Sequence, residues 1–239
     1  MLSKINLEKV LFIDIETVAQ HPEFDQLAAD IKAHWVKKSQ FIGAENETTE
    51  DTYGRAGIYA EFGKIVCISV GFIRLENNIK TLRVKSYANE EEAILLTDFF
   101  DLLNKHYTHR DALLCAHNGK EFDFPYIARR ALINGIAIPD ILDLAGKKPW
   151  EVKHLDTLQL WKFGDYKHYT SLSLLTTIFN IPTPKDDIDG SMVNNVYWKE
   201  NDLKRIANYC EKDVVALTQL FLRFRNESLI KANHMISSS

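Results

Sequence analysis

Two carboxylates interrupt an apolar stretch near the start of the chain. Residues 10–15 (VLFIDI) form a β-branched run typical of a buried strand, yet Asp14 lies inside it and Glu16 follows two residues later. Side chains two residues apart share one face of a strand, so both carboxylates point the same way. One interpretation is a strand end where two acids reach water, because acids are seldom buried without partners. The other is a strand that holds two carboxylates for chemistry.

Length and composition favour one globular domain. The chain has 239 residues, 46% of them hydrophobic, which suits a single domain with room for a large insertion. We expect that domain to cover residues 1–239, with a variable insertion at 19–62 and a disordered tail at 230–239. No apolar run is long enough to span a bilayer and the first residues lack a secretory core, so no membrane association is expected.

Net charge and cysteine content further limit the kinds of protein that this chain can be. The net charge of −4 argues against a large phosphate-neutralising face of the kind that wraps duplex DNA, but it allows a small site that takes a strand end together with metal ions. Cys67, Cys115 and Cys210 are odd in number, widely spaced and in apolar surroundings. They indicate buried thiols in a reducing compartment, and we expect a cytoplasmic protein.

Strand and helix patterns alternate along the chain and predict an α/β domain with a mixed central sheet. The connection Glu76-Asn77-Asn78 predicts a hairpin. The residues at 140–170 show only short helical pieces. We expect strands at 8–16, 63–75, 79–88 and 111–118, and helices at 89–107, 121–136, 171–181 and 200–225.

Two further acids lie at edges of these elements. Asp123 is in the first turn of helix 121–136, just beyond strand 111–118, where α/β folds place ligands. Taken alone, it is also an ordinary helix-start acid. Asp213 lies in the last helix, and Tyr209 lies one turn before it on the same face. Taken alone, this pair is better explained as a solvent-facing acid and a tyrosine at the edge of the core.

The conjunction of these acids favours a metal site. Two carboxylates ~4 Å apart repel by about 4 kcal/mol at an effective dielectric constant of 20, so four converging acids need neutralisation. Oxygen ligands without a histidine or cysteine cluster select Mg²⁺ or Mn²⁺ over zinc. Two such ions about 4 Å apart perform in-line phosphoryl transfer.

Three segments carry a family resemblance. The segments "FIDIET", "HNGKEFDFPYIARR" and "YCEKDVVAL" resemble the three motifs of the DEDD superfamily of 3′–5′ exonucleases. The chain looks most like the stand-alone relatives of the proofreading exonuclease domain of family-B DNA polymerases. One branch of the superfamily has histidine five residues before the last acid, where this chain has Asn208. The other branch has tyrosine four residues before it, and here that residue is Tyr209.

The resemblance implies an RNase H-like fold, with a mixed five-stranded sheet flanked by helices, and two divalent cations, Mg²⁺ or Mn²⁺. Asp14, Glu16 and Asp213 would hold the first ion, and Asp14 would bridge to the second. Asp123 would bind the second ion directly or through water. Tyr209 would orient the attacking water rather than abstract its proton, because an unperturbed tyrosine has a pKa of about 10.

The resemblance also implies a substrate. The expected activity is hydrolysis of phosphodiester bonds from the 3′ end of single-stranded nucleic acid, DNA being favoured, and a proofreading role would need a protein partner of unknown identity. The alternatives are an exoribonuclease and a non-catalytic nucleic-acid-binding module. By the same likeness, three residues would contact the strand end: Thr17, Asn118 and Phe122.

Other residues have weaker functional interpretations. Asp156 is an extra acid that could support the site. Arg129 and Arg130 fit a solvated helix face better than a strand-binding groove. The basic middle of the chain contains aromatic residues that could stack on bases, although ordinary surface charge beside core aromatics explains them as well. These aromatic residues are Trp150, Trp161, Tyr166 and Tyr169.

Overall fold

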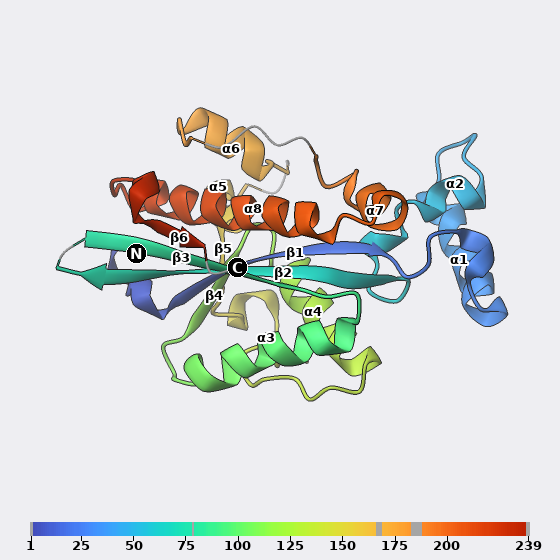
Figure 1. Cartoon of the computed structure of the whole chain (residues 1–239), viewed down its shortest axis with the longest axis horizontal. Helices are drawn as coiled ribbons and strands as arrows, with labels where there is room; N and C mark the ends of the chain where they lie inside the picture. The colour runs from blue at the N-terminus through green and yellow to red at the C-terminus, as the bar shows by residue number, and fades with distance from the viewer. Residues whose placement is uncertain (1, 78, 166–168, 183–187, 238–239) are drawn as a thin grey trace.

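A six-stranded mixed sheet forms the centre of the fold (Figure 1). The computed structural model describes residues 2–77, 79–165, 169–182 and 188–237. The strand order is β5-β4-β1-β2-β3-β6; the β1–β2 and β2–β3 pairs are antiparallel, and the other neighbouring pairs are parallel. The strands are β1 (Val10–Ala19), β2 (Gly63–Glu76), β3 (Ile79–Ala88), β4 (Leu113–Ala116), β5 (Leu155–Asp156) and β6 (Met235–Ser237).

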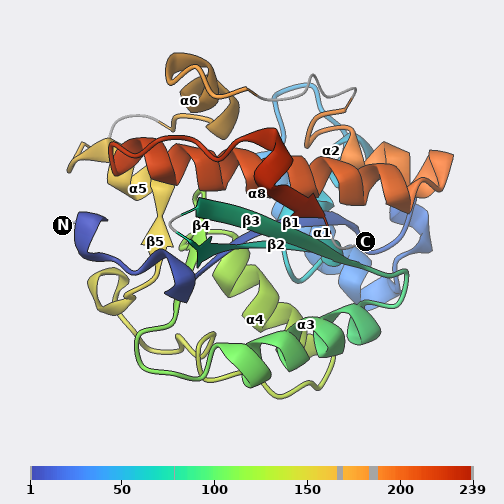
Figure 2. The same cartoon turned by 60° about the vertical axis from the view of Figure 1, so that its left-hand side comes forward.

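Helices cover both faces of the sheet (Figures 1 and 2). The long helix α8 (Leu203–Phe224) crosses one face, with α5 (Thr157–Lys162) and α6 (Leu172–Ile178) beside it, whereas α3 (Glu92–His106) and α4 (Asp123–Ile133) lie on the other face. The remaining helical segments are α1 (Ala29–Ile42), α2 (Thr49–Tyr53), α7 (Val193–Asn195), the single π turn η6 (Val196–Glu200), and 3₁₀ turns at Leu2–Lys4, Leu7–Lys9, Phe24–Gln26, Ala56–Ile58, Pro149–Glu151 and Ala232–His234.

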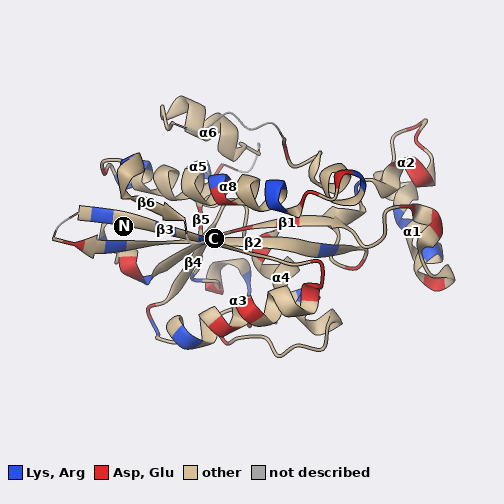
Figure 3. Ribbon diagram, viewed as in Figure 1, with Lys and Arg blue, Asp and Glu red and all other residues tan. Residues whose placement is uncertain are grey.

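The described part of the chain contains no helix with both the length and the apolarity that crossing a bilayer requires. Lys and Arg are distributed over several elements, among them α1, α3, α8 and the β2–β3 hairpin (Figure 3).

The central strand β1 is buried on both faces, and its side chains alternate between two core clusters. Ile13 and Ile15 pack into the cluster that includes α3 and α4. Phe12 belongs to the opposite cluster, where its ring lies 5.6 Å from that of Phe221 on α8. Even-numbered side chains of β1 up to residue 16 therefore face α8.

The α/β class, the mixed sheet and the β2–β3 hairpin are as predicted, and the long helices α3, α4 and α8 lie where the apolar spacing places them. The predicted number of strands was wrong, because the residues that the structure describes form a sheet of six strands rather than five. The short strands β5 and β6 form its two edges.

The expected disordered tail at 230–239 is also wrong over most of its length. Residues 235–237 form β6, which pairs in parallel with β3. Ile230 is buried, and its backbone N–H and C=O both bond to the side chain of Gln219 on α8, at 3.0 and 2.7 Å. The segment is ordered because long-range contacts to α8 and β3 hold it, and its own polar composition does not indicate them. The last two residues lie outside the described part.

The segment at 19–62 builds a small cluster of its own. Trp35 of α1 is fully buried and packs edge-on against Tyr53 and Phe62, with ring centroids 5.5 and 5.0 Å apart. A separate aromatic cluster explains how this part of the chain extends from the end of β1 with order of its own (Figure 1).

Arg130 is buried between α4 and α3, which overturns the interpretation of a solvated helix face at this position. Its guanidinium lies 2.9 Å from a Glu92 carboxylate oxygen, and each side chain is at most 7% exposed. Glu92 also accepts the N–H of Ile65 at 2.7 Å. The preceding residue, Arg129, is exposed as expected.

Candidate active site

Strand β1 aims two acidic side chains at α8. Asp14 and Glu16 follow Phe12 on the same face, and a register shift occurs between Glu16 and Thr17. Ligand atoms of Asp14, Glu16 and Cys210 of α8 all lie within 4.8 Å of one another. A bulge at this point re-aims side chains, as bulges beside active sites often do. The strand therefore brings two carboxylates together on the face of the sheet that α8 covers.

Helix α8 contributes Asp213 and Tyr209 to the same place. Both are half-buried and lie one turn apart on the helix. The charge of Asp213 is the strongest ionic influence on Asp14, and Tyr209 is hydrogen-bonded to Asp213. These two residues, predicted from one helical face, therefore border the pair on β1.

Asp123 reaches the site from α4, on the other face of the sheet. It is the first residue of that helix and only 3% exposed. Its carboxylate accepts the backbone N–H of Ile15, and its charge acts on Asp14. The connection from β4 to α4 thus places the fourth acid against the backbone of β1, between the residues that carry the first two.

Burial and neighbouring negative charge raise the pKa values of three of the acids, Asp14, Glu16 and Asp123. Burial raises the pKa of Asp14 well above its ordinary value, and the charges of Asp213 and Asp123 raise it further. Burial, followed by the charge of Asp14, raises the pKa of Glu16 in the same way. Burial also raises the pKa of Asp123 to about 7, although backbone hydrogen bonds oppose the shift. Such a cluster is unfavourable for the protein alone and suits a cation.

The donor set fits hard divalent ions. Asp14 and Glu16 supply carboxylate oxygens, which suit Mg²⁺ and Mn²⁺, and the charges of Asp213 and Asp123 act on Asp14 from either side of the sheet. The tightest group also contains the sulfur of Cys210, a softer donor. The residues present therefore fit the ions that the sequence resemblance implies, because the raised pKa values show that the folded chain leaves the negative charge of Asp14 and Glu16 poorly compensated.

Cys210 is a neighbour of the site that the sequence indicated only as a buried thiol. Its thiol donates to the backbone oxygen of Asp14 at 3.4 Å and to a carboxylate oxygen at 3.3 Å. It is fully buried. Its position three residues before Asp213 on one helical face is the signal that could have identified it.

Asp156 organises the turn that carries Asn118. One carboxylate oxygen accepts the N–H of Asn118 at 3.0 Å, and the other accepts that of Lys120 at 3.1 Å. The first oxygen also caps α5. Asn118 has a left-handed backbone with φ of +64°, and a Cβ on Gly119 would lie 2.3 Å from that of Ala116. Asp156 therefore supports the site by fixing the turn that leads to α4.

The predicted strand-end contacts have different surroundings. The Thr17 hydroxyl is hydrogen-bonded to Tyr126 of α4. The ring of Phe122 is half-buried and lies 5.3 Å from that of Tyr126. Asn118 is half-buried at the end of β4. All three residues flank the acids, although Thr17 faces α4 rather than α8.

The aromatic residues of the middle region differ in how far they are exposed. Trp161 packs against Phe179 and Phe224 and belongs to a core cluster. Trp150 is 78% exposed and Tyr169 is 66% exposed. Tyr166, and the basic residues 167 and 168, lie outside the described residues.

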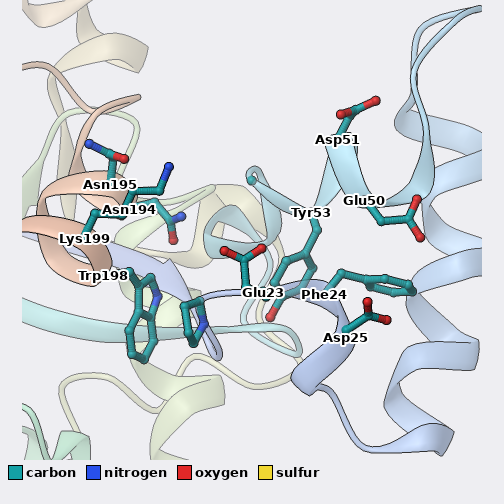
Figure 4. A pocket seen from close by; sticks show the side chains of 12 residues that line it. Glu23, Phe24, Asp25, Glu50, Asp51, Tyr53, Asn194, Asn195, Trp198 and Lys199 are labelled. Carbon is teal, nitrogen blue, oxygen red and sulfur yellow. The ribbon is translucent and has the colours of Figure 1, made fainter.

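A further cavity of about 290 Å³ lies between the segment at 19–62 and the π turn η6 (Figure 4). Asn194 ties its wall to the end of β1 by accepting the N–H of Ala19 at 2.9 Å. Two of its acids already have partners: Asp25 pairs with Lys32, and Asp51 caps α2. None of the predicted site residues lines this cavity.

Comparison with known proteins also indicates a nuclease. A family model described as a predicted 3′–5′ exonuclease related to the exonuclease domain of PolB matches residues 58–233. This span contains Asp123, Tyr209 and Asp213, whereas Asp14 and Glu16 precede it.

The fold is similar to that of the family B DNA polymerase from the hyperthermophilic archaeon Pyrobaculum calidifontis, with a TM-score of 0.51 and 15% sequence identity. The similarity covers 89% of this chain and 24% of the polymerase chain, and it confirms the expected RNase H-like fold. No functionally curated protein matches the sequence. By its motifs, its fold and the family model, the chain belongs to the family of predicted 3′–5′ exonucleases related to the exonuclease domain of PolB.

Proposed function

We propose that this protein hydrolyses phosphodiester bonds from the 3′ end of single-stranded DNA and that it uses two divalent cations, Mg²⁺ or Mn²⁺. The observation that carries the proposal is the convergence of acids from β1, α4 and α8, with burial raising the pKa values of Asp14, Glu16 and Asp123 and neighbouring negative charges raising them further. A stable fold retains such a group most simply when the acids bind cations.

Each acid has a position that suits its proposed role. Asp14 lies centrally, because it is close to Glu16 and feels the charges of both Asp213 and Asp123. It is the residue best placed to contact both ions. Glu16 and Asp213 would complete the first site, and Asp123 the second. When bound, the ions neutralise the carboxylates, lower the pKa of water and stabilise charge that develops on the phosphate.

Tyr209 is suited to orient the attacking water. Burial raises its pKa far above the ordinary value, and the charges of Asp213 and Glu16 raise it further. Its hydroxyl therefore stays protonated near neutral pH and cannot accept a proton as a general base. Held by Asp213, it can direct the water oxygen toward phosphorus, opposite the leaving 3′ oxygen.

Single-stranded DNA is the favoured substrate for two reasons. The sequence resembles proofreading domains, and the net charge of −4 suits a site that takes a strand end rather than a duplex. A role beside a polymerase would require a separate protein partner. We also propose a cytoplasmic location, supported by three buried free thiols.

The test is degradation of a 5′-labelled single-stranded oligonucleotide with Mg²⁺ or Mn²⁺. We expect a ladder that shortens from the 3′ end, release of nucleoside monophosphates and loss of activity in Asp14→Ala. Asp111→Ala, which removes an exposed acid from a turn, is the matched control. Equal activity in Asp14→Ala and wild type would contradict the proposal, as would binding without cleavage under both metals. Faster cleavage of RNA of the same sequence would show that RNA, rather than DNA, is the preferred substrate.

A further inference from the structure

A second tyrosine, Tyr169, lies beside the acidic site and has no role in the chemistry described above. It precedes α6, and its ring is 66% exposed. Exposed aromatic rings are unremarkable when isolated. The position of this one is fixed by its neighbours.

His117 ties this part of the chain to the end of β4. Its Nε2–H donates to the backbone oxygen of Thr170 at 2.8 Å, and its Nδ1 lies 2.9 Å from the hydroxyl oxygen of Thr157. The rings of His117 and Tyr169 meet edge-on with centroids 6.1 Å apart. Because His117 immediately precedes Asn118, these contacts hold Tyr169 next to the turn that leads to Asp123.

The negative charges of the site act on Tyr169, in agreement with this placement. Partial loss of hydration raises its pKa, and the charges of Asp123, Asp14 and Asp213 raise it further. Among the other aromatic candidates, Trp161 is packed in a core cluster. Trp150 adjoins the opposite end of β4, because the nearby Lys153 bonds to the backbone of Arg110, which precedes that strand. Of the aromatic candidates that the structure describes, Tyr169 is thus the one that is both exposed and next to the acids.

We propose that the ring of Tyr169 stacks on the base of the 3′-terminal nucleotide while the acids hold the adjoining phosphate. This inference rests on the proposed exonuclease function and adds the surface that grips the strand end. His117 already restrains the ring, so stacking orders little that is mobile beforehand. An aromatic face accepts every base, which suits an enzyme that removes nucleotides one after another.

The experiment measures KM and kcat on a single-stranded DNA oligonucleotide and on the same strand with an abasic 3′-terminal nucleotide. Loss of one base–aromatic stack corresponds to roughly 5- to 150-fold weaker binding. We expect Tyr169→Ala to raise KM by a factor in this range with little change in kcat. The effect should disappear on the abasic substrate, where no base remains to stack. Tyr169→Phe retains the ring and should behave as wild type. Trp150→Ala, at the other end of β4, is the matched control for loss of an exposed aromatic.

Fluorescence anisotropy in an Asp14→Asn background gives the same comparison without turnover, as dissociation constants. Equal affinity of Tyr169→Ala and its parent for the normal oligonucleotide would overturn the inference. So would an equal loss on normal and abasic strands, or a loss in Tyr169→Phe as large as in Tyr169→Ala. A wild-type protein that binds but never cleaves, with the Tyr169 effect intact, would refute the exonuclease proposal and leave the stacking surface standing.

Discussion

Replacing Asp14 with Asn should make the metal-free protein more stable while removing its response to metal. The side chains of Asp14 and Glu16 have ligand atoms within 4.8 Å of each other. Two full charges at that distance repel by roughly 3.5 kcal/mol at an effective dielectric constant of about 20. Because both pKa values are raised, proton uptake relieves part of this repulsion, and we expect a gain of about 1–3 kcal/mol in the free energy of unfolding.

The dependence on pH has a defined sign. Carboxyls with raised pKa bind more protons in the folded than in the unfolded chain, so the contribution of Asp14 and Glu16 to the stability of the metal-free wild type falls as pH rises above about 4. The Asp14→Asn variant loses part of this decline, and its advantage grows with pH. Mg²⁺ at 100 times its dissociation constant adds about 2.7 kcal/mol to the wild type. The variant should gain much less.

Urea unfolding in EDTA and in Mg²⁺, at several pH values, measures these differences. Asp111→Asn removes an exposed acid and should match the wild type in both conditions. If metal-free Asp14→Asn were less stable than the wild type and gained as much from Mg²⁺, the electrostatic account of the site would be refuted.

Three further outcomes follow from single contacts. Arg130→Met leaves the buried Glu92 without its charged partner and should lower the free energy of unfolding in urea by about 3–5 kcal/mol. The control Arg129→Met changes an exposed arginine and should alter that free energy by less than about 0.5 kcal/mol, so similar values for the two variants would contradict the buried pair. Burial lowers the pKa of His154 from 6.5 to about 4, so the unfolded chain takes up a proton first as pH falls. The contribution of His154 to stability should therefore drop by up to about 3 kcal/mol as pH falls from 6.5 to 4. The difference in stability between His154→Gln and the wild type should change with pH over that window, and a constant difference would exclude this residue as the cause. Tyr209→Phe should reduce kcat by about 10- to 100-fold with KM nearly unchanged, as expected when a group acts on the reacting water, and equal kcat values would remove the role given to the hydroxyl.

Local patterns anticipated the elements that carry the acids. Alternation along β1 predicted that Asp14 and Glu16 share a face, and helical spacing predicted the same for Tyr209 and Asp213. Period and register suffice in these cases because each pair lies within one regular element. That the elements meet follows from the family resemblance and from the sheet order, which no short segment encodes.

The features that the sequence did not predict share a different cause. Arg130 is charged and adjoins an exposed arginine, yet its partner Glu92 is 38 residues away on another helix. The segment at 235–237 is short and near a serine-rich end, and it is ordered by pairing with β3. Cys210 resembles any apolar residue of a buried helical stripe until the fold places Asp14 beside it. Each case depends on a contact between distant residues, which local periodicity does not report.

The most direct test of the cation site is anomalous scattering from crystals of the protein grown with Mn²⁺. We expect two peaks about 4 Å apart among Asp14, Glu16, Asp123 and Asp213, with Asp14 in contact with both, and loss of at least one peak in Asp14→Asn. A saturating Mn²⁺ concentration that gives no peak among these four carboxylates, while they keep their positions, would contradict the proposed two-cation site.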